Sequence, residues 1–124
     1  MWKDDATAAD ILLAAQDVQQ FTKGLTYQDF LDNQMVQAAV LYRIAVMGEA
    51  TKRLSLEFRR AHPDIEWKQI AGLRDRCVHG YDNIKLDIVW EVVTVDAPTV
   101  EKYLKTVVKP PPESSGDDSL SQKP

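Results

Sequence analysis

Residues 73–82, LRDRCVHGYD, bring two arginines, a histidine and a tyrosine into one short stretch. Arginine offers a permanently charged, forked donor for a phosphate oxygen, and histidine exchanges protons near neutral pH. Arg74 and His79 could therefore cleave RNA without a metal ion, by helping the ribose 2′-hydroxyl attack its own phosphate and by stabilising the charge that develops. The alternative is a plain helix C-terminus, whose dipole favours cations. Residue types alone favour this alternative slightly.

The spacing of the two candidate residues constrains the elements that carry them. Arg74 and His79 are five positions apart, which places them about 140° apart on a continuous helix. They can converge only if the helix ends at His79, or if a second copy of the segment supplies the other half of the site. Gly80 suits the left-handed position just past a helix end.

Two long amphipathic helices are predicted upstream of this stretch. The first carries apolar residues at steps of three and four: Ile11, Ala14, Val18, Phe21 and Leu25. Gly24 then acts as a stop, with Thr26 and Asp32 as candidate N-caps. The second helix carries a wider apolar surface: Val36, Val40, Ile44, Met47, Ala50 and Leu54, flanked by Leu41 and Ala45. Such a helix is central in a bundle or covered by a second subunit.

The rest of the chain is also predicted to be helical. Ser55 caps a short helix through Phe58, and Pro63 ends it. The next helix runs from about Glu66 to His79, with Trp67, Ile70, Ala71 and Cys77 inward. The β-branched residues of 88–95 favour a strand, yet apolar spacing over 86–107 favours a helix, kinked near Pro98. These elements make an all-α, four- to five-helix antiparallel bundle.

Composition limits the classes of protein and of site. The 124 residues indicate one domain, over 1–108, followed by a proline- and serine-rich tail, 109–124, expected to be disordered. No segment predicts a membrane span or signal peptide, so the protein is expected to be cytoplasmic. Cys77 is the single cysteine, which excludes an intramolecular disulfide and Cys-rich zinc site and predicts a half-buried thiol. With two histidines, a metal site is not expected.

The net charge of −4 conceals a segregation of charge along the chain. Residues 43–76 carry eight lysines or arginines against five acids, whereas residues 1–42 carry two against six. The middle of the chain could face a phosphate backbone, or could form an ordinary solvated helix surface with charges of both signs. Signatures of phosphate-binding loops, zinc proteases and esterases are missing.

The stretch RDRCVHGY matches the pattern R-x-x-x-x-H-x-Y and resembles the HepT-like toxins of the HEPN superfamily. The likeness extends to MGEATKRLSLEFRRAHPDIEW and IAGLRDRCVHGYDNIKLDIVW and covers residues 8 to 108. It implies an HEPN-like helical homodimer with both motifs at the dimer cleft, acting as a metal-independent ribonuclease toxin of a type II toxin–antitoxin system. Arg74 and His79 would then be the catalytic pair.

The resemblance also implies a partner and a modification. The usual antitoxin is MntA, a minimal nucleotidyltransferase that transfers AMP from ATP to the motif tyrosine, which here is Tyr81. The protein itself would need no cofactor, because the partner uses the ATP. Added nucleotide phosphates at Tyr81 would occupy the place that RNA phosphate needs beside the basic pair. A two-fold axis would also bring two helix ends together.

Three further residues are candidates for supporting roles. Asp75 stands where the family often has Asn, and it could orient Arg74 or weaken its attraction for phosphate. Arg76 could contact the RNA backbone or lie in solvent. Glu49 could pair with a motif arginine or be an ordinary polar helix residue. A rival hypothesis is a non-catalytic helical binding module that serves as the substrate or scaffold of a nucleotidyltransferase.

Overall fold

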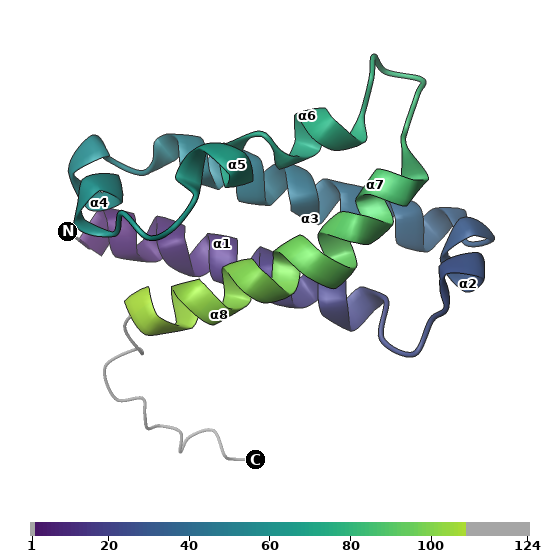
Figure 1. The fold of residues 1–124 in the computed structure, drawn as a ribbon, viewed down its shortest axis with the longest axis horizontal. Helices are drawn as coiled ribbons and strands as arrows, with labels where there is room; N and C mark the ends of the chain where they lie inside the picture. Colours follow the sequence, from purple (N-terminus) through teal and green to yellow (C-terminus); the bar gives the residue numbers. More distant parts are fainter. Residues whose placement is uncertain (1, 109–124) are drawn as a thin grey trace.

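The computed structural model describes residues 2–108 and confirms an all-α bundle (Figure 1). The elements follow one another as α1 (Trp2–Phe21), α2 (Tyr27–Leu31), α3 (Gln34–Arg53), α4 (Leu56–Ala61), α5 (Trp67–Ala71), α6 (Leu73–Cys77), α7 (Leu86–Glu91), the π turn η1 (Val92–Asp96) and α8 (Ala97–Val107). Helix α1 packs against both α3 and α8, which run opposite to it. The predicted tail, 109–124, lies outside the described residues.

Helix α1 buries the first three residues of the predicted stripe, and Leu25, the last residue of that stripe, lies beyond the helix end. Ile11, Ala14 and Val18 are fully buried, but Phe21 is 39% exposed, because it is the last residue of the helix. Gly24 follows with a φ of +81°, a left-handed conformation that glycine adopts without steric cost. The prediction of a stop at this glycine is therefore confirmed.

One of the two predicted N-caps is wrong. Thr26 caps α2 as predicted: its Oγ1 accepts from the Asp29 N–H (3.0 Å), and its own N–H donates to Asp29 Oδ2 (2.9 Å). Asp32 ends α2 instead of capping α3, because its N–H donates to carbonyls of α2. The N-cap of α3 is Asn33, whose Oδ1 accepts from the Val36 N–H (3.1 Å).

Helix α3 forms the centre of the bundle, with Val40, Ile44 and Met47 fully buried. After it, Ser55 caps α4 as predicted, since its Oγ accepts from the Phe58 N–H (3.0 Å). The same hydroxyl donates to Asp4 Oδ2 (2.7 Å) and so ties the two helix starts together. Helix α4 continues to Ala61, three residues beyond the predicted end.

The single helix predicted over 66–79 is wrong in two respects. It is divided into α5 and α6 at Gly72, a residue of low helix propensity. It also ends at Cys77, two residues early, because the Cys77 carbonyl accepts from the Lys85 N–H (2.8 Å) and Val78 is extended. The valine forms an antiparallel bridge with Ile84. Trp67 and Ile70 face inward as predicted, whereas Ala71 is half-buried.

Residues 86–107 form a helix rather than a strand. The irregularity predicted near Pro98 is the π turn η1, in which the Ala97 N–H donates to the Val92 carbonyl, five residues back. Proline has no N–H with which to continue an α-helical ladder through this position. None of the helices within 2–108 has the length and apolar character that a membrane crossing requires.

Candidate active site

The predicted site lies at the end of α6 and on the loop that follows it. Residues 78–84 form a hairpin that projects from the bundle between α6 and α7 (Figure 1). Backbone bonds close it: the His79 N–H donates to the Asn83 carbonyl (2.8 Å), and the Lys85 N–H donates to the Cys77 carbonyl (2.8 Å). Hydrogen bonds within its own backbone therefore hold this segment in its projecting conformation.

Gly80 makes the reversal of the hairpin possible. Its φ of +76° lies in the left-handed region, where a side chain would cost about 1–2 kcal/mol. The sequence predicts this conformation just past a helix end, and the structure places it in the hairpin three residues after α6. The two flanking residues, His79 and Tyr81, are both exposed.

Arg74 and His79 do not share a helix, so the separation of about 140° calculated for a continuous helix does not apply to them. Arg74 is on α6 with its side chain 54% exposed, whereas His79 lies two residues beyond the helix end. Among the described residues, no hydrogen bond or ion pair joins their side chains. Within one chain the two groups are therefore accessible and close in sequence, without being locked to each other.

Tyr81 is 95% exposed, more than any other large hydrophobic side chain in the described part of the chain. Its position at the outer part of the hairpin leaves the phenol open to solvent. An exposed phenol can be approached by a second macromolecule without unfolding of the bundle.

The supporting candidates differ in their surroundings. Asp75 Oδ1 lies 3.6 Å from Arg74 Nη1, so one carboxylate is beside the candidate phosphate-binding group. Arg76 pairs with Glu91 at the end of α7 (3.5 Å) and with Asp96 in η1 (3.3 Å). Neither partner was foreseen, because they are 15 and 20 positions away in the sequence.

Glu49 lies on α3 and pairs with Lys52 one turn further along (3.4 Å). No ion pair links it to Arg74 or Arg76 in the described chain. Its neighbour Gly48 has a clearer role: a Cβ at this position would lie 3.0 Å from the Ala71 carbonyl oxygen. Glycine thus lets the end of α5 approach the backbone of α3, two residues before α6 begins.

Buried residues hold α6 against α3. Leu73 and Cys77 are four positions apart and both lie in the core. Cys77 is fully buried rather than half-buried as predicted, because the helix ends with this face against α3. Burial raises the pKa of its thiol to about 11, so the thiol stays protonated and is an unreactive part of the packing.

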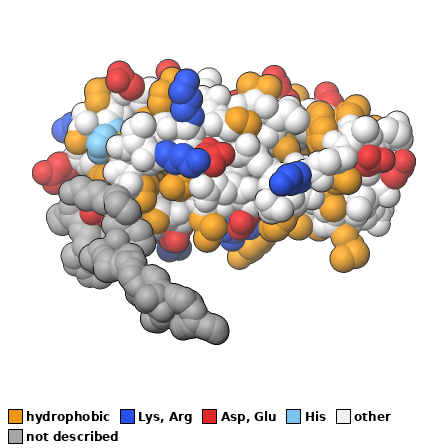
Figure 2. Space-filling view, turned by 90° about the horizontal axis from the view of Figure 1, so that it is seen from below, with side chains coloured by type: hydrophobic (Ala, Val, Ile, Leu, Met, Phe, Trp, Pro, Cys, Tyr) orange, Lys and Arg blue, Asp and Glu red, His pale blue; other side chains and the backbone are white. Residues whose placement is uncertain are grey.

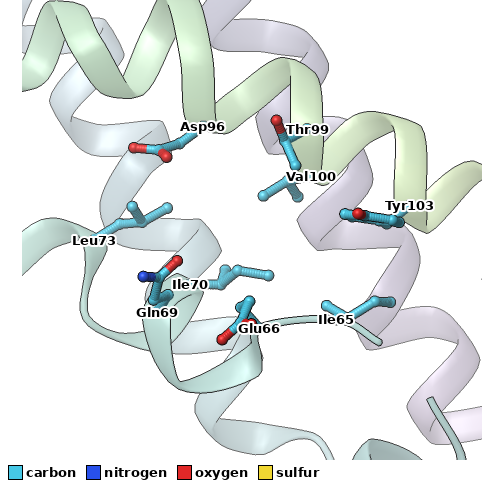
Figure 3. A pocket seen from close by; sticks show the side chains of 9 residues that line it. All are labelled: Ile65, Glu66, Gln69, Ile70, Leu73, Asp96, Thr99, Val100 and Tyr103. Atoms are coloured by element: carbon cyan, nitrogen blue, oxygen red, sulfur yellow. The ribbon is translucent and has the colours of Figure 1, made fainter. Parts of the chain in front are cut away.

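A small groove separates α5 and α6 from α8 (Figure 3). Its side chains are mainly apolar and point toward one another, with Glu66 and Asp96 at the rim. Its volume of about 70 Å³ is room for two or three waters, too little for a nucleotide. No cluster of three potential metal-ligating side chains occurs within residues 2–108.

The face opposite the hairpin shows no concentration of one charge. In Figure 2, which views the molecule from below, acidic, basic and hydrophobic side chains alternate over the visible surface. A basic surface for a phosphate backbone is therefore absent from this view. Arg74 lies on α6, and His79 lies in the hairpin that follows it.

Comparison with known proteins identifies the family. A family model described as "Ribonuclease HepT-like" matches residues 11–107. A Methanocaldococcus jannaschii protein named "Putative RNase MJ1380" is 36% identical over 98 residues, 79% of this chain and 90% of that protein. A Thermococcus cleftensis protein named "Probable ribonuclease HepT" is 33% identical over 92 residues, 74% and 84% of the two chains. No solved structure gives a significant match. The chain belongs to the HepT-like family of the HEPN superfamily.

Proposed function

We propose that the protein is the toxin of a type II toxin–antitoxin system and cleaves RNA without a metal ion. The observation that carries this proposal is the exposure of Arg74, His79 and Tyr81 at one helix end and its hairpin, in a chain of the HepT-like family. Relatives named as ribonucleases support the reaction class. RNA is the proposed substrate.

The two basic residues have distinct roles in the reaction. His79 accepts the proton of the ribose 2′-hydroxyl, whose oxygen then attacks the adjacent phosphorus. Arg74 donates hydrogen bonds to the phosphate oxygens, where negative charge develops. The bond to the 5′-oxygen breaks, and this oxygen takes up a proton from a second imidazole. The products are a 2′,3′-cyclic phosphate and a 5′-hydroxyl.

A second copy of the chain supplies that second imidazole. Since no contact locks Arg74 to His79 within one chain, a two-fold homodimer that apposes the two α6 ends would complete the site from both copies. The exposed hairpins are free for such an arrangement. A dimer cleft of this kind also excludes water and strengthens the electrostatic contacts.

Regulation is proposed to act at Tyr81. An MntA-like nucleotidyltransferase antitoxin would transfer AMP from ATP to the phenol, whose 95% exposure allows it to enter a partner's active site. Each added AMP brings negative charge next to Arg74 and His79 and competes with RNA phosphate. The toxin needs no cofactor of its own in this scheme.

The decisive experiment incubates the purified dimer with RNA in the presence of a chelator. Cleavage is expected for the wild type, and His79→Ala should lower the rate by about 10²–10⁴-fold, the usual contribution of a general acid–base group. Tyr81→Phe is the matched control: it should still cleave but should escape neutralisation by the antitoxin. Undiminished toxicity of the His79→Ala variant would disprove the mechanism.

The second candidate function is a non-catalytic binding module for a nucleotidyltransferase. The exposed Tyr81 favours it as much as the first. It predicts a stable complex and an adduct at Tyr81, but no chelator-resistant cleavage by the unmodified dimer, so the same assay separates the two.

A further inference from the structure

The side chain of Arg76 joins three elements around the root of the hairpin. Its guanidinium lies 3.5 Å from Glu91 Oε1 on α7 and 3.3 Å from Asp96 Oδ2 in η1. We call these three residues the Arg76 clamp. Because Arg76 is on α6 and Glu91 on α7, the clamp holds together the two helices between which the hairpin projects.

The π turn is what brings the two acids to one arginine. Positions 91 and 96 are five apart, which on an α-helix would turn them about 140° away from each other. A π turn bonds residues five apart, as the Ala97 N–H does with the Val92 carbonyl, and so brings positions five apart toward one face. Such irregular turns occur frequently at functional sites.

Helix α6 depends on contacts of this kind for its orientation. It has five residues and no side-chain hydrogen bond at its N-terminus, and a helix of this length has little stability of its own. Leu73 and Cys77 fix the buried face. Arg74 and Arg76 flank that face on opposite sides, about 200° apart. The clamp therefore fixes the rotation of α6 about its axis, and with it the direction of Arg74.

We propose that Arg76 is a positioning residue that acts through Arg74 and His79. Held by Glu91 and Asp96, it sets the direction of Arg74 and the root of the hairpin that carries His79. This proposal rests on the proposed ribonuclease function. All three side chains are partly exposed, and exposed ion pairs contribute little to folding stability. The clamp is therefore expected to matter for geometry more than for stability.

The test compares Arg76→Glu with the double exchange Arg76→Glu and Asp96→Arg, which restores opposite charges across the same gap. Arg60→Glu on α4 is the control with the same change in net charge. The single variant should lose kcat by about ten-fold or more, since a misplacement of about 1 Å can cost about a hundred-fold. Its KM should stay within about two-fold, because ground-state binding is unaffected. The double exchange should recover most of the loss, and the control should match wild type.

Asp96→Asn separates positioning from direct RNA contact by the sign of its effect. If Arg76 positions the site, removing this carboxylate lowers kcat. If Arg76 instead bound RNA phosphate, removing a competing acid would lower KM, and the double exchange would stay impaired; either result overturns the proposal. The proposal is also overturned if the loss of kcat in these variants is explained by a loss of folding stability, measured as a lower urea midpoint.

Amide hydrogen exchange provides a readout that does not depend on cleavage. The His79 and Lys85 amides close the hairpin, and they should exchange faster in Arg76→Glu and return to the wild-type rate in the double exchange. If the wild type cleaves no RNA but this pattern appears, the clamp stands and the proposed function fails. Unchanged exchange at these amides, with unchanged kcat, refutes the clamp itself.

Discussion

The contact between Gly48 and α5 offers the sharpest test of how the bundle positions the site. Replacing Gly48 with alanine adds one methyl group, whose carbon would lie 3.0 Å from the Ala71 oxygen and 3.6 Å from the Ile70 oxygen. Both neighbours are backbone atoms of α5, so neither can rotate away as a side chain could. Helix α5, and with it α6, must shift by a few tenths of an ångström.

Two effects of opposite sign determine the stability of this variant. Alanine within a helix is about 1 kcal/mol more favourable than glycine, while overpacking a filled interface typically costs about 1–3 kcal/mol. The net change in the free energy of unfolding should thus lie between about 0 and 2 kcal/mol of destabilisation. The rate of RNA cleavage should fall by more than this change in stability alone would cause, because the shift of α5 and α6 displaces Arg74.

Gly72→Ala is the matched control at the same junction. A Cβ there would meet nothing closer than the Lys68 oxygen at 3.6 Å, and the φ of −96° suits alanine. This variant should be neutral or more stable by about 0.4–1 kcal/mol. Urea denaturation measures the free energy of unfolding of both variants, and RNA cleavage assays measure their activity. A Gly48→Ala protein that is about 1 kcal/mol more stable than wild type, with full activity, would refute the reasoning.

Three further variants or conditions test other contacts. Hydrogen bonds from the Ser55 N–H and hydroxyl lower the pKa of Asp4 from its usual value of 3.8. The contribution of the Asp4 carboxylate to folding stability is therefore complete above pH 3.8 and is lost as the pH falls through the lowered pKa. In Asp4→Asn, the free energy of unfolding, measured by urea denaturation, should depend less on pH in this acidic range. Cys77 should resist alkylation at pH 8 and react only in denaturant, because its pKa is raised to about 11; labelling of the native protein would contradict its burial. Gly80→Ala should cost about 1–2 kcal/mol of strain in the hairpin and should lower cleavage more than thermal stability, as paired melting and RNA assays would show.

The sequence predicted the long helices because their apolar periodicity extends over many turns. Ile11, Ala14 and Val18 on α1 and Val40, Ile44 and Met47 on α3 are buried as predicted. Over 86–107 the same periodicity correctly outweighed the β-branched residues. The wide turn before Pro98 was foreseen only as a kink, because the choice between a bend and a π turn depends on neighbouring helices.

The prediction failed where the structure depends on contacts between distant residues. The helix over 66–79 divides at Gly72 and ends at Cys77, where a backbone bond from Lys85 takes the carbonyl. Nothing in the local spacing reveals that bond. Arg76 likewise pairs with Glu91 and Asp96 because of how α6 lies on α7. The assignment of chemistry to Arg74, His79 and Tyr81 came from residue types and family resemblance, and it stays a prediction.

The closed root of the hairpin has an evolutionary consequence. All residues from His79 to Lys85 are exposed. Backbone hydrogen bonds at the base of this segment, rather than packing into the core, hold its conformation. New side chains at 82–84, outside the pattern that holds His79 and Tyr81, can therefore accumulate there at little expense to the bundle. Such changes would alter what the hairpin contacts while leaving Arg74, His79 and Tyr81 in place.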